Sequence, residues 1–154
     1  MNLAPNFTLQ EMLKSELGSR LNIPNEPTQE QIDNLTQLAQ KVLQTVRDAL
    51  KRGVKVNSGF RSVELNKAVG GSPTSDHTKG MAADIEIPGV SNHTVAKWIQ
   101  DNLNFTQVIL EFYMPGVPDS GWVHVSYDPK NLKKQALTAT RRNGKTVYLP
   151  GLLV

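Results

Sequence analysis

Three side chains of types that bind divalent metal ions, His77, Asp84 and His124, stand out in this sequence because they lie within or beside apolar strand-like segments. His77 and Asp84 lie seven positions apart in the stretch SDHTKGMAAD, and His124 lies in the stretch WVHVS. Because the chain has three histidines and no cysteine, any metal site must use imidazole and carboxylate ligands. Two imidazoles and one carboxylate form a three-ligand zinc set that leaves a fourth position for water.

The alternation of residues around Asp84 and His124 predicts that both side chains face either solvent or a polar cleft. Side chains alternate along a strand, so Asp84 and Glu86 share one face of AADIEI, while His124 shares its face of WVHVS with Trp122 and Ser126. An ionised carboxylate is costly to bury without a partner. The same pattern also fits residues that bind no metal: Asp84 as an exposed acid on an edge strand, His77 as an exposed loop histidine, and His124 as a histidine that only makes hydrogen bonds. The spacing alone does not distinguish these alternatives, because nothing in it brings the two segments together.

Local signals predict the helices and strands that must position these side chains. Capping boxes and the helical spacing of apolar residues predict helices over about 8–15, 28–53, 62–69 and 92–103. Alternating segments predict strands in VKVNSGF, AADIEI, QVILEFY and GWVHVSY, and Asn143-Gly144 predicts a two-residue hairpin turn in LTATRRNGKTVYL. The expected fold is a single α+β domain over residues 1–154, with N-terminal helices packed on a mostly antiparallel sheet.

Three segments, SGFRS, SDHTKGMAADI and GWVHVSY, resemble the signature segments of the M15 zinc peptidases. This family includes D-Ala-D-Ala carboxypeptidases and dipeptidases, and phage endolysins that cut peptidoglycan stem peptides. The resemblance covers about residues 5–130 and implies a hedgehog/DD-peptidase-like fold, with residues 131–154 as a C-terminal extension that carries the hairpin. The positions that match the family pattern are Ser75, His77, Gly80, Ala82, Asp84, Trp122 and His124.

The resemblance implies a role for several of these side chains. His77, Asp84 and His124 would be the ligands of a Zn²⁺ cofactor. Arg61, in SGFRS, would face the substrate, where its permanent charge can bind a carboxylate or a developing oxyanion. Ser75 would either donate a hydrogen bond to the substrate or cap the turn that carries His77. The third histidine of the chain lies outside every motif and is expected at the surface.

The general base of the implied site has two candidates in this sequence. Many members carry a glutamate three residues before the last metal ligand, but this chain has Gly121 there. Our first candidate is Glu111, since the strand QVILEFY is expected to pair with the strand of His124. The second candidate is Asp119, five residues before His124, in a connection that is also expected to form the substrate-binding rim of the cleft. Asp119 is equally well explained as a turn residue.

Composition and charge limit the partners. No run approaches the roughly 18 apolar residues that span a bilayer, so membrane insertion is not expected, and MNLAPNFTLQEML shows no signal-peptide pattern. A net charge of +3 favours an anionic partner. Nucleic acid is not expected, because the basic C-terminal hairpin has no aromatic-rich binding face beside it. We expect a monomer.

The resemblance thus implies a zinc metallopeptidase that hydrolyses peptide bonds in peptidoglycan stem peptides, as a phage or prophage lysin. Such a protein would be made in the host cytoplasm and act at the bacterial cell wall after release. The motifs do not distinguish a D,D-carboxypeptidase from an L,D- or D,D-endopeptidase. The alternative is a non-catalytic zinc-binding protein that retains the fold, because the usual glutamate is missing at position 121.

Overall fold

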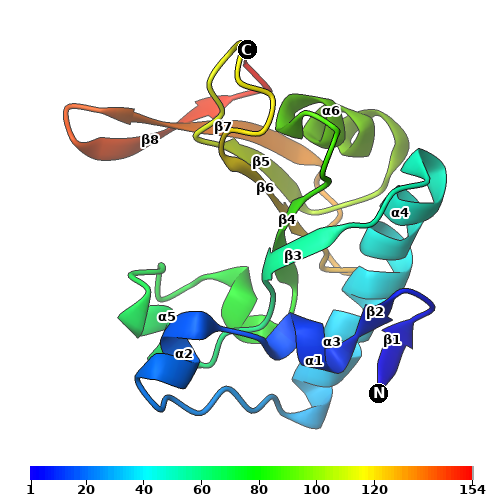
Figure 1. Cartoon of the computed structure of the whole chain (residues 1–154), viewed down its shortest axis with the longest axis vertical. Helices are drawn as coiled ribbons and strands as arrows, with labels where there is room; N and C mark the ends of the chain where they lie inside the picture. Colours follow the sequence, from blue (N-terminus) through cyan, green and yellow to red (C-terminus); the bar gives the residue numbers. More distant parts are fainter. Residues whose placement is uncertain (154) are drawn as a thin grey trace.

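The computed structural model describes residues 1–153 and contains one large sheet with helices against it (Figure 1). The six strands of this sheet lie in the order β3-β4-β6-β5-β7-β8. All neighbouring pairs are antiparallel except β5 and β7, which run parallel. The predicted α+β class and the mostly antiparallel sheet are therefore confirmed. The strands are β3 (Lys55–Ser58), β4 (Ala82–Glu86), β5 (Gln107–Glu111), β6 (Trp122–Ser126), β7 (Gln135–Arg142) and β8 (Lys145–Pro150).

Two predicted helix starts are present at the N-terminal half of the chain. Thr8 caps α1 (Leu9–Leu13) and Thr28 caps α3 (Gln29–Leu38), each in a complete capping box. The first helix is shorter than expected and is followed by α2 (Glu16–Arg20), which begins at its own cap, Ser15. A small sheet of β1 (Asn2–Ala4) and β2 (Phe7–Thr8), which the sequence did not predict, precedes α1.

The helix expected over about 28–53 forms, but it is not uniform. A π-helical turn, η1 (Ala39–Leu43), separates α3 from α4 (Gln44–Leu50). The column ends before Gly53, because Lys51 adopts a left-handed conformation with φ of 56° and its N–H bonds back to Arg47. Among residues 1–153, no helix is both long and apolar enough to cross a membrane.

The remaining elements connect the strands that carry the candidate ligands. α5 (Val63–Ala68) begins at Ser62, and α6 (Asn92–Asn102) begins at Ser91, both as predicted. The loop before β4 contains a short 3-10 helix, η2 (Asp76–Lys79), that was not predicted.

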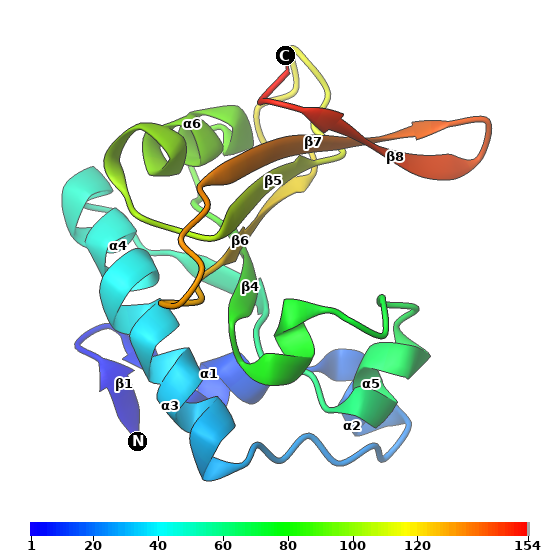
Figure 2. The same cartoon turned by 180° about the vertical axis from the view of Figure 1, so that it is seen from behind.

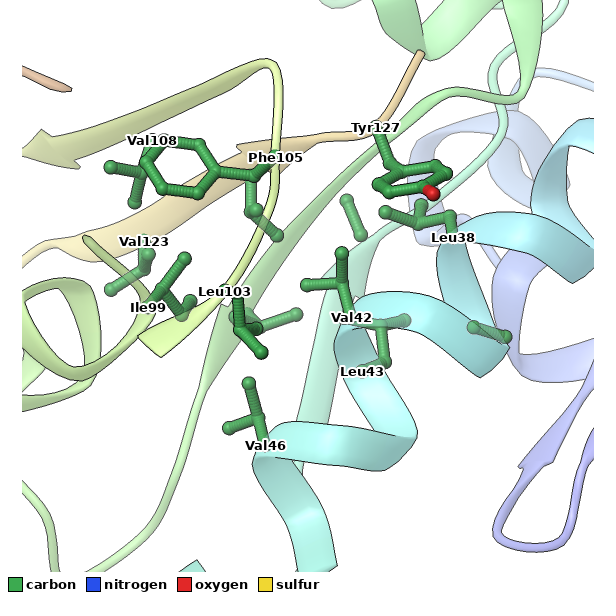
Figure 3. Close-up of a cluster of buried hydrophobic side chains, with 14 of the residues drawn as sticks. Leu38, Val42, Leu43, Val46, Ile99, Leu103, Phe105, Val108, Val123 and Tyr127 are labelled. Atoms are coloured by element: carbon green, nitrogen blue, oxygen red, sulfur yellow. The ribbon is translucent and has the colours of Figure 1, made fainter. Parts of the chain in front are cut away.

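The core lies between one face of the sheet and the helices α3, α4 and α6 (Figures 1 and 2). Alternation puts one set of apolar side chains of β4, β5 and β6 on this face, namely Ala83, Ile85, Val108, Leu110, Val123 and Val125. The candidate site residues Asp84, Glu111 and His124 are on the other face. Figure 3 shows the centre of this cluster, where the helical column meets α6 and the sheet. Its labelled residues are Leu38, Val42, Leu43, Val46, Ile99, Leu103, Phe105, Val108, Val123 and Tyr127, all buried.

The C-terminal hairpin forms at the predicted turn. Asn143 and Gly144 have φ of 54° and 76°, as a type I′ turn requires. The sequence did not predict where the hairpin joins the sheet. β7 lies parallel beside β5, with Ile109 opposite Leu137 and Glu111 opposite Ala139. The hairpin projects from the same side of the molecule as the segment around α5 (Figures 1 and 2).

Candidate active site

The structure brings His77, Asp84 and His124 together. β4 pairs with β6 so that Asp84 lies directly opposite His124, and η2 delivers His77 to the same point. Asp84 Oδ1 lies 3.3 Å from His77 Nε2 and 3.1 Å from His124 Nδ1. The ligand atoms of the three residues all lie within 4.8 Å of one another. Strand pairing, rather than sequence spacing, therefore assembles the cluster.

The turn that carries His77 is held from several sides. The His77 ring is 2% exposed, and its Nδ1 lies 2.7 Å from the carbonyl oxygen of Gly59. An N–H at Nδ1 donates to that oxygen, so Nε2 is the ring nitrogen that faces Asp84 and is left to bind a metal. The hydroxyl of Ser75 accepts a hydrogen bond of 3.2 Å from the backbone N–H of His77. The orientation of the His77 ring is therefore fixed by contacts outside the cluster.

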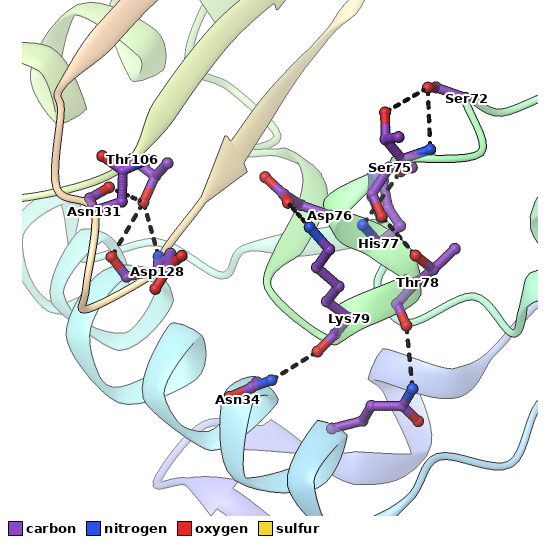
Figure 4. A network of polar contacts seen from close by, with 12 residues as sticks. Asn34, Ser72, Ser75, Asp76, His77, Thr78, Lys79, Thr106, Asp128 and Asn131 are labelled. Carbon is purple, nitrogen blue, oxygen red and sulfur yellow. Dashed lines mark hydrogen bonds and ion pairs between the residues drawn. The ribbon is translucent and has the colours of Figure 1, made fainter.

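Helix α3 supports the same turn from below (Figure 4). Asn34 donates to the carbonyl oxygen of Lys79 at 2.9 Å, and Gln31 donates to that of Thr78 at 3.2 Å. Gly80 ends the turn with φ of 74°, and a Cβ there would lie 2.5 Å from the backbone oxygen of Gln31. A residue without a side chain is therefore required at the position that the family motif also gives as glycine.

The electrostatics of the cluster favour a charged carboxylate between two imidazoles. Burial alone would raise the pKa of Asp84, but the charge of His77 and hydrogen bonds from both rings hold that pKa well below its usual range. Burial alone would lower the pKa of His124, but the hydrogen bond and charge of Asp84 outweigh it and leave that pKa raised. Asp84 is therefore ionised at neutral pH, as a metal ligand must be.

The donor set and its spacing fit a zinc ion. Zinc binds nitrogen and carboxylate oxygen at about 2.0–2.2 Å in a tetrahedron, so two ligand atoms lie roughly 3.3–3.5 Å apart. The separations of Asp84 Oδ1 from the two ring nitrogens, 3.3 and 3.1 Å, are close to this value. The hydrogen bond from His77 to Gly59 is of the kind that orients metal-bound histidines. Small side-chain movements would complete such a site.

Glu111 lies on the strand next to His124 and on the same face of the sheet. β5 pairs with β6 so that Ile109 is opposite His124 and Glu111 is opposite Trp122. The indole N–H of Trp122 donates to Glu111 Oε2 at 2.5 Å. Burial, together with the negative charge of Asp84, raises the pKa of Glu111. A half-buried carboxylate of raised pKa, oriented by a single donor, has the properties of a general base.

Gly121 explains why the carboxylate is not three residues before His124. Gly121 has φ of 65°, and a Cβ there would lie 1.9 Å from the carbonyl oxygen of Glu111. The chain passes so close to the end of β5 that no side chain fits at position 121. In this structure the carboxylate beside the cluster is instead that of Glu111, on the neighbouring strand.

Arg61 extends into the same cleft with part of its hydrogen-bonding capacity unused. Its backbone N–H donates to the carbonyl oxygen of His77 at 3.1 Å, which ties the SGFRS segment to η2. Within residues 1–153, the buried Nε atom of Arg61 has no hydrogen-bond partner. Burial lowers the pKa of Arg61, while the charges of Asp84 and Glu111 act in the opposite direction. An arginine that lines a cleft and keeps an unpaired donor is suited to an anionic ligand.

Of the remaining residues discussed from the sequence, Ser75 lies in the cleft, whereas Asp119 lies outside it. Ser75 lines the cleft, but its hydroxyl caps the turn of His77. Asp119 does not line this cleft. It lines a separate cavity of about 310 Å³ that also contains Glu86. His93, expected at the surface, is partly exposed, with its ring 5.9 Å from that of Tyr113.

The cleft has a volume of about 720 Å³ and extends well beyond the three candidate ligands. One wall is the glycine-rich loop before η2, and the floor is formed by β4, β5 and β6. The other wall, which sequence reasoning missed, is the C-terminal hairpin. The only available signal was alternation along β7 and β8, and it could not be used until the partner strand of β7 was known. The hairpin residues that line the cleft are Leu137, Arg141, Thr146 and Tyr148.

Comparison with known protein families agrees with this geometry. The model of the family described as Peptidase M15 matches residues 5–126, which include Arg61, the His77-Asp84-His124 cluster and Glu111. A search of the curated proteins gave no match. Members of this family are metal-dependent peptidases, and the metal-binding residue types of this chain meet in one cleft. Because the match covers most of its length, the chain belongs to the peptidase M15 family.

Proposed function

We propose that this protein is a zinc-dependent peptidase that hydrolyses peptide bonds in the stem peptides of peptidoglycan. The observation that carries the proposal is the convergence of His77, Asp84 and His124 within 4.8 Å, in a cleft that also contains Glu111 and Arg61. A zinc ion held by the three ligands would supply Lewis-acid chemistry, in which a carbonyl is polarised and the pKa of water falls to about 7.

Glu111 acts as the general base in this proposal. Its carboxylate accepts a proton from the attacking water and transfers it to the nitrogen of the leaving amine. Trp122 occupies Glu111 Oε2 through its indole N–H, so Oε1 is the atom free to take the proton. The raised pKa makes Glu111 a better proton acceptor than an exposed carboxylate.

Arg61 binds the developing negative charge or a substrate carboxylate. Arg61 lines the cleft and its Nε lacks a partner among the described residues. An anionic group placed there would gain a charge-assisted hydrogen bond. It would also offset the cost of keeping this arginine half-buried.

Two properties support peptidoglycan as the substrate. The first is the resemblance of the motifs to enzymes that cut stem peptides, and the second is the net charge of +3, which suits an anionic polymer. We further propose that the protein is a phage or prophage lysin that acts at the bacterial cell wall. This setting comes from the likeness of the motif segments to those of phage endolysins.

The test is digestion of purified peptidoglycan, followed by mass spectrometry of the released fragments. We expect zinc-dependent release of peptide fragments that stops with a chelator and returns when zinc is added back. The masses will identify the bond and so distinguish carboxypeptidase from endopeptidase action. If one equivalent of zinc binds and no peptidoglycan or stem peptide is cut, the proposal fails and the non-catalytic zinc-binding alternative replaces it.

A further inference from the structure

The C-terminal hairpin lies outside the family match, which ends at residue 126, yet it forms one wall of the cleft. The pairing register explains which of its side chains face the candidate ligands. Glu111 lies opposite Ala139, and Ala139 lies opposite Tyr148, so these residues form one row across the sheet. By alternation, Arg141 and its partner Thr146 are on the same face as Glu111. The neighbouring Arg142 is on the other face.

An aromatic contact places the guanidinium of Arg141 at the cleft. It lies 5.3 Å from the centre of the Phe112 ring, a distance typical of a cation–π contact. The Phe112 ring in turn packs 5.4 Å from the ring of Trp122, the residue that orients Glu111. The hairpin is thus connected to the candidate base through side-chain contacts.

The contact between Phe112 and Arg141 depends on an unusual backbone conformation of Phe112. Phe112 has φ of 57°, a left-handed conformation that is uncommon for an aromatic residue. Its N–H donates to the carbonyl oxygen of Ala139 at 2.9 Å, so β7 itself holds the conformation. Continued strand alternation would have turned Phe112 away from Glu111, whereas this conformation lets both residues line the cleft. Backbone strain of this kind is concentrated at functional sites.

Arg141 has no acidic partner within the described part of the chain, where the ion pairs involve other residues. It is exposed to the cleft, and the adjoining Tyr148 is 53% exposed. A free guanidinium held over an aromatic ring and facing a cleft is suited to a carboxylate. Arg141 and Tyr148 both line the cleft.

The position of the hairpin sets the length of the peptide that would reach it. Arg141 is on β7, two strand positions from β6 through β5, which corresponds to about 10 Å at ~4.8 Å per strand. An extended peptide advances about 3.4 Å per residue. Arg141 is therefore at least about three residues from a bond that lies at the His77-Asp84-His124 cluster.

We propose that the β7–β8 hairpin is a second substrate-binding wall, on which Arg141 binds a peptide carboxylate at least about three residues from the bond that is cut. This inference rests on the proposed function and adds a specificity: the protein selects extended, acidic stem peptides over dipeptides. The hairpin would supply this selectivity from a segment that is separate from the catalytic motifs.

The test compares Arg141→Gln with Arg142→Gln, because the two arginines are adjacent, exposed and on opposite faces of β7. Both substitutions are made in a Glu111→Gln background, so that binding is measured without turnover. The probes are a synthetic stem pentapeptide with all carboxylates free and two counterparts, one amidated at the side-branch carboxylate of its second residue and one at its C-terminus. Calorimetry on the zinc-loaded proteins gives each Kd, and thermal melting checks the fold.

We expect Arg141→Gln to weaken binding of the free pentapeptide by about 10- to 100-fold, the range for loss of a charged hydrogen bond. Arg142→Gln should change Kd by less than 3-fold, and Arg141→Lys should be intermediate because it keeps the charge without the planar fork. One amidated peptide should bind equally to the parent and to Arg141→Gln. If Arg141→Gln has no effect, or weakens all three peptides alike, the inference is wrong.

The same measurements separate this inference from the proposed function. Cleavage by the unmodified protein tests the function, and Arg141-dependent binding in the Glu111→Gln background tests the hairpin. Cleavage with no Arg141 effect would leave the function in place and refute the hairpin as a binding wall. Arg141-dependent binding without any cleavage by the unmodified protein would support the hairpin as a binding wall and refute the proposed peptidase function.

Discussion

Replacing Glu111 by glutamine removes the proposed general base while keeping its shape. Loss of a general base costs about 10²- to 10⁴-fold in rate, which corresponds to roughly 3–5 kcal/mol of transition-state stabilisation. A glutamine can still accept the 2.5 Å hydrogen bond from Trp122, so the side chain keeps its orientation. Because burial and Asp84 both disfavour the charged form of Glu111, the neutral replacement should not lower the melting temperature. The variant should therefore fold, bind zinc and fail to turn over.

The assay is the initial rate of stem-peptide cleavage at saturating zinc, with zinc content measured on the same sample. Asp119→Asn is the matched control, since Asp119 is the other candidate base and lines a different cavity. We expect Asp119→Asn to retain activity within a few-fold of the unmodified protein. If Glu111→Gln keeps more than a tenth of the activity, or if Asp119→Asn is the more damaged variant, the assignment of Glu111 is wrong.

Three other expectations follow from the geometry. Alanine at His77, Asp84 or His124 should each lower zinc affinity and, with zinc present, thermal stability together; a variant with unchanged metal content would remove that residue from the ligand set. In the metal-free protein, the lowered pKa of Asp84 stabilises the fold above the usual pKa of 3.8, and this stabilisation is lost as the pH falls. The raised pKa of His124 stabilises the fold below the usual pKa of 6.5, and this stabilisation is lost as the pH rises. The melting temperature should thus be highest between these values, and Asp84→Asn should flatten the profile. Gly121→Glu should lower the free energy of unfolding by roughly 3 kcal/mol or more, from backbone strain and overpacking against Glu111, and unchanged denaturant unfolding would contradict this.

The predictable parts of the fold are those encoded by neighbouring residues. The caps at Thr8, Thr28 and Ser91 and the turn at Asn143 each depend on contacts within a few positions, and each forms as expected. Lys51 shows the limit even of local signals, because the helix was expected to extend to about residue 53, whereas α4 ends at Leu50 and Lys51 is left-handed.

The pairing of strands that are far apart in the sequence was harder to predict from local signals. Alternation placed Asp84 and His124 on polar strand faces, but only the register of β4 with β6 puts them opposite each other, and the family resemblance was needed to expect it. The parallel placement of β7 beside β5 had no local signal, since an alternating strand fits any partner with an apolar face. For this reason Arg141 and Tyr148 were not expected in the cleft. Phe112 was missed because its left-handed conformation depends on the hydrogen bond to Ala139.

The central claim is that His77, Asp84 and His124 hold one metal ion. Anomalous diffraction at the zinc absorption edge, on crystals grown with one equivalent of zinc, tests it most directly. We expect a single strong peak about 2.0–2.2 Å from His77 Nε2, Asp84 Oδ1 and a ring nitrogen of His124. A peak elsewhere, or no peak within bonding distance of all three residues at saturating zinc, would contradict the account.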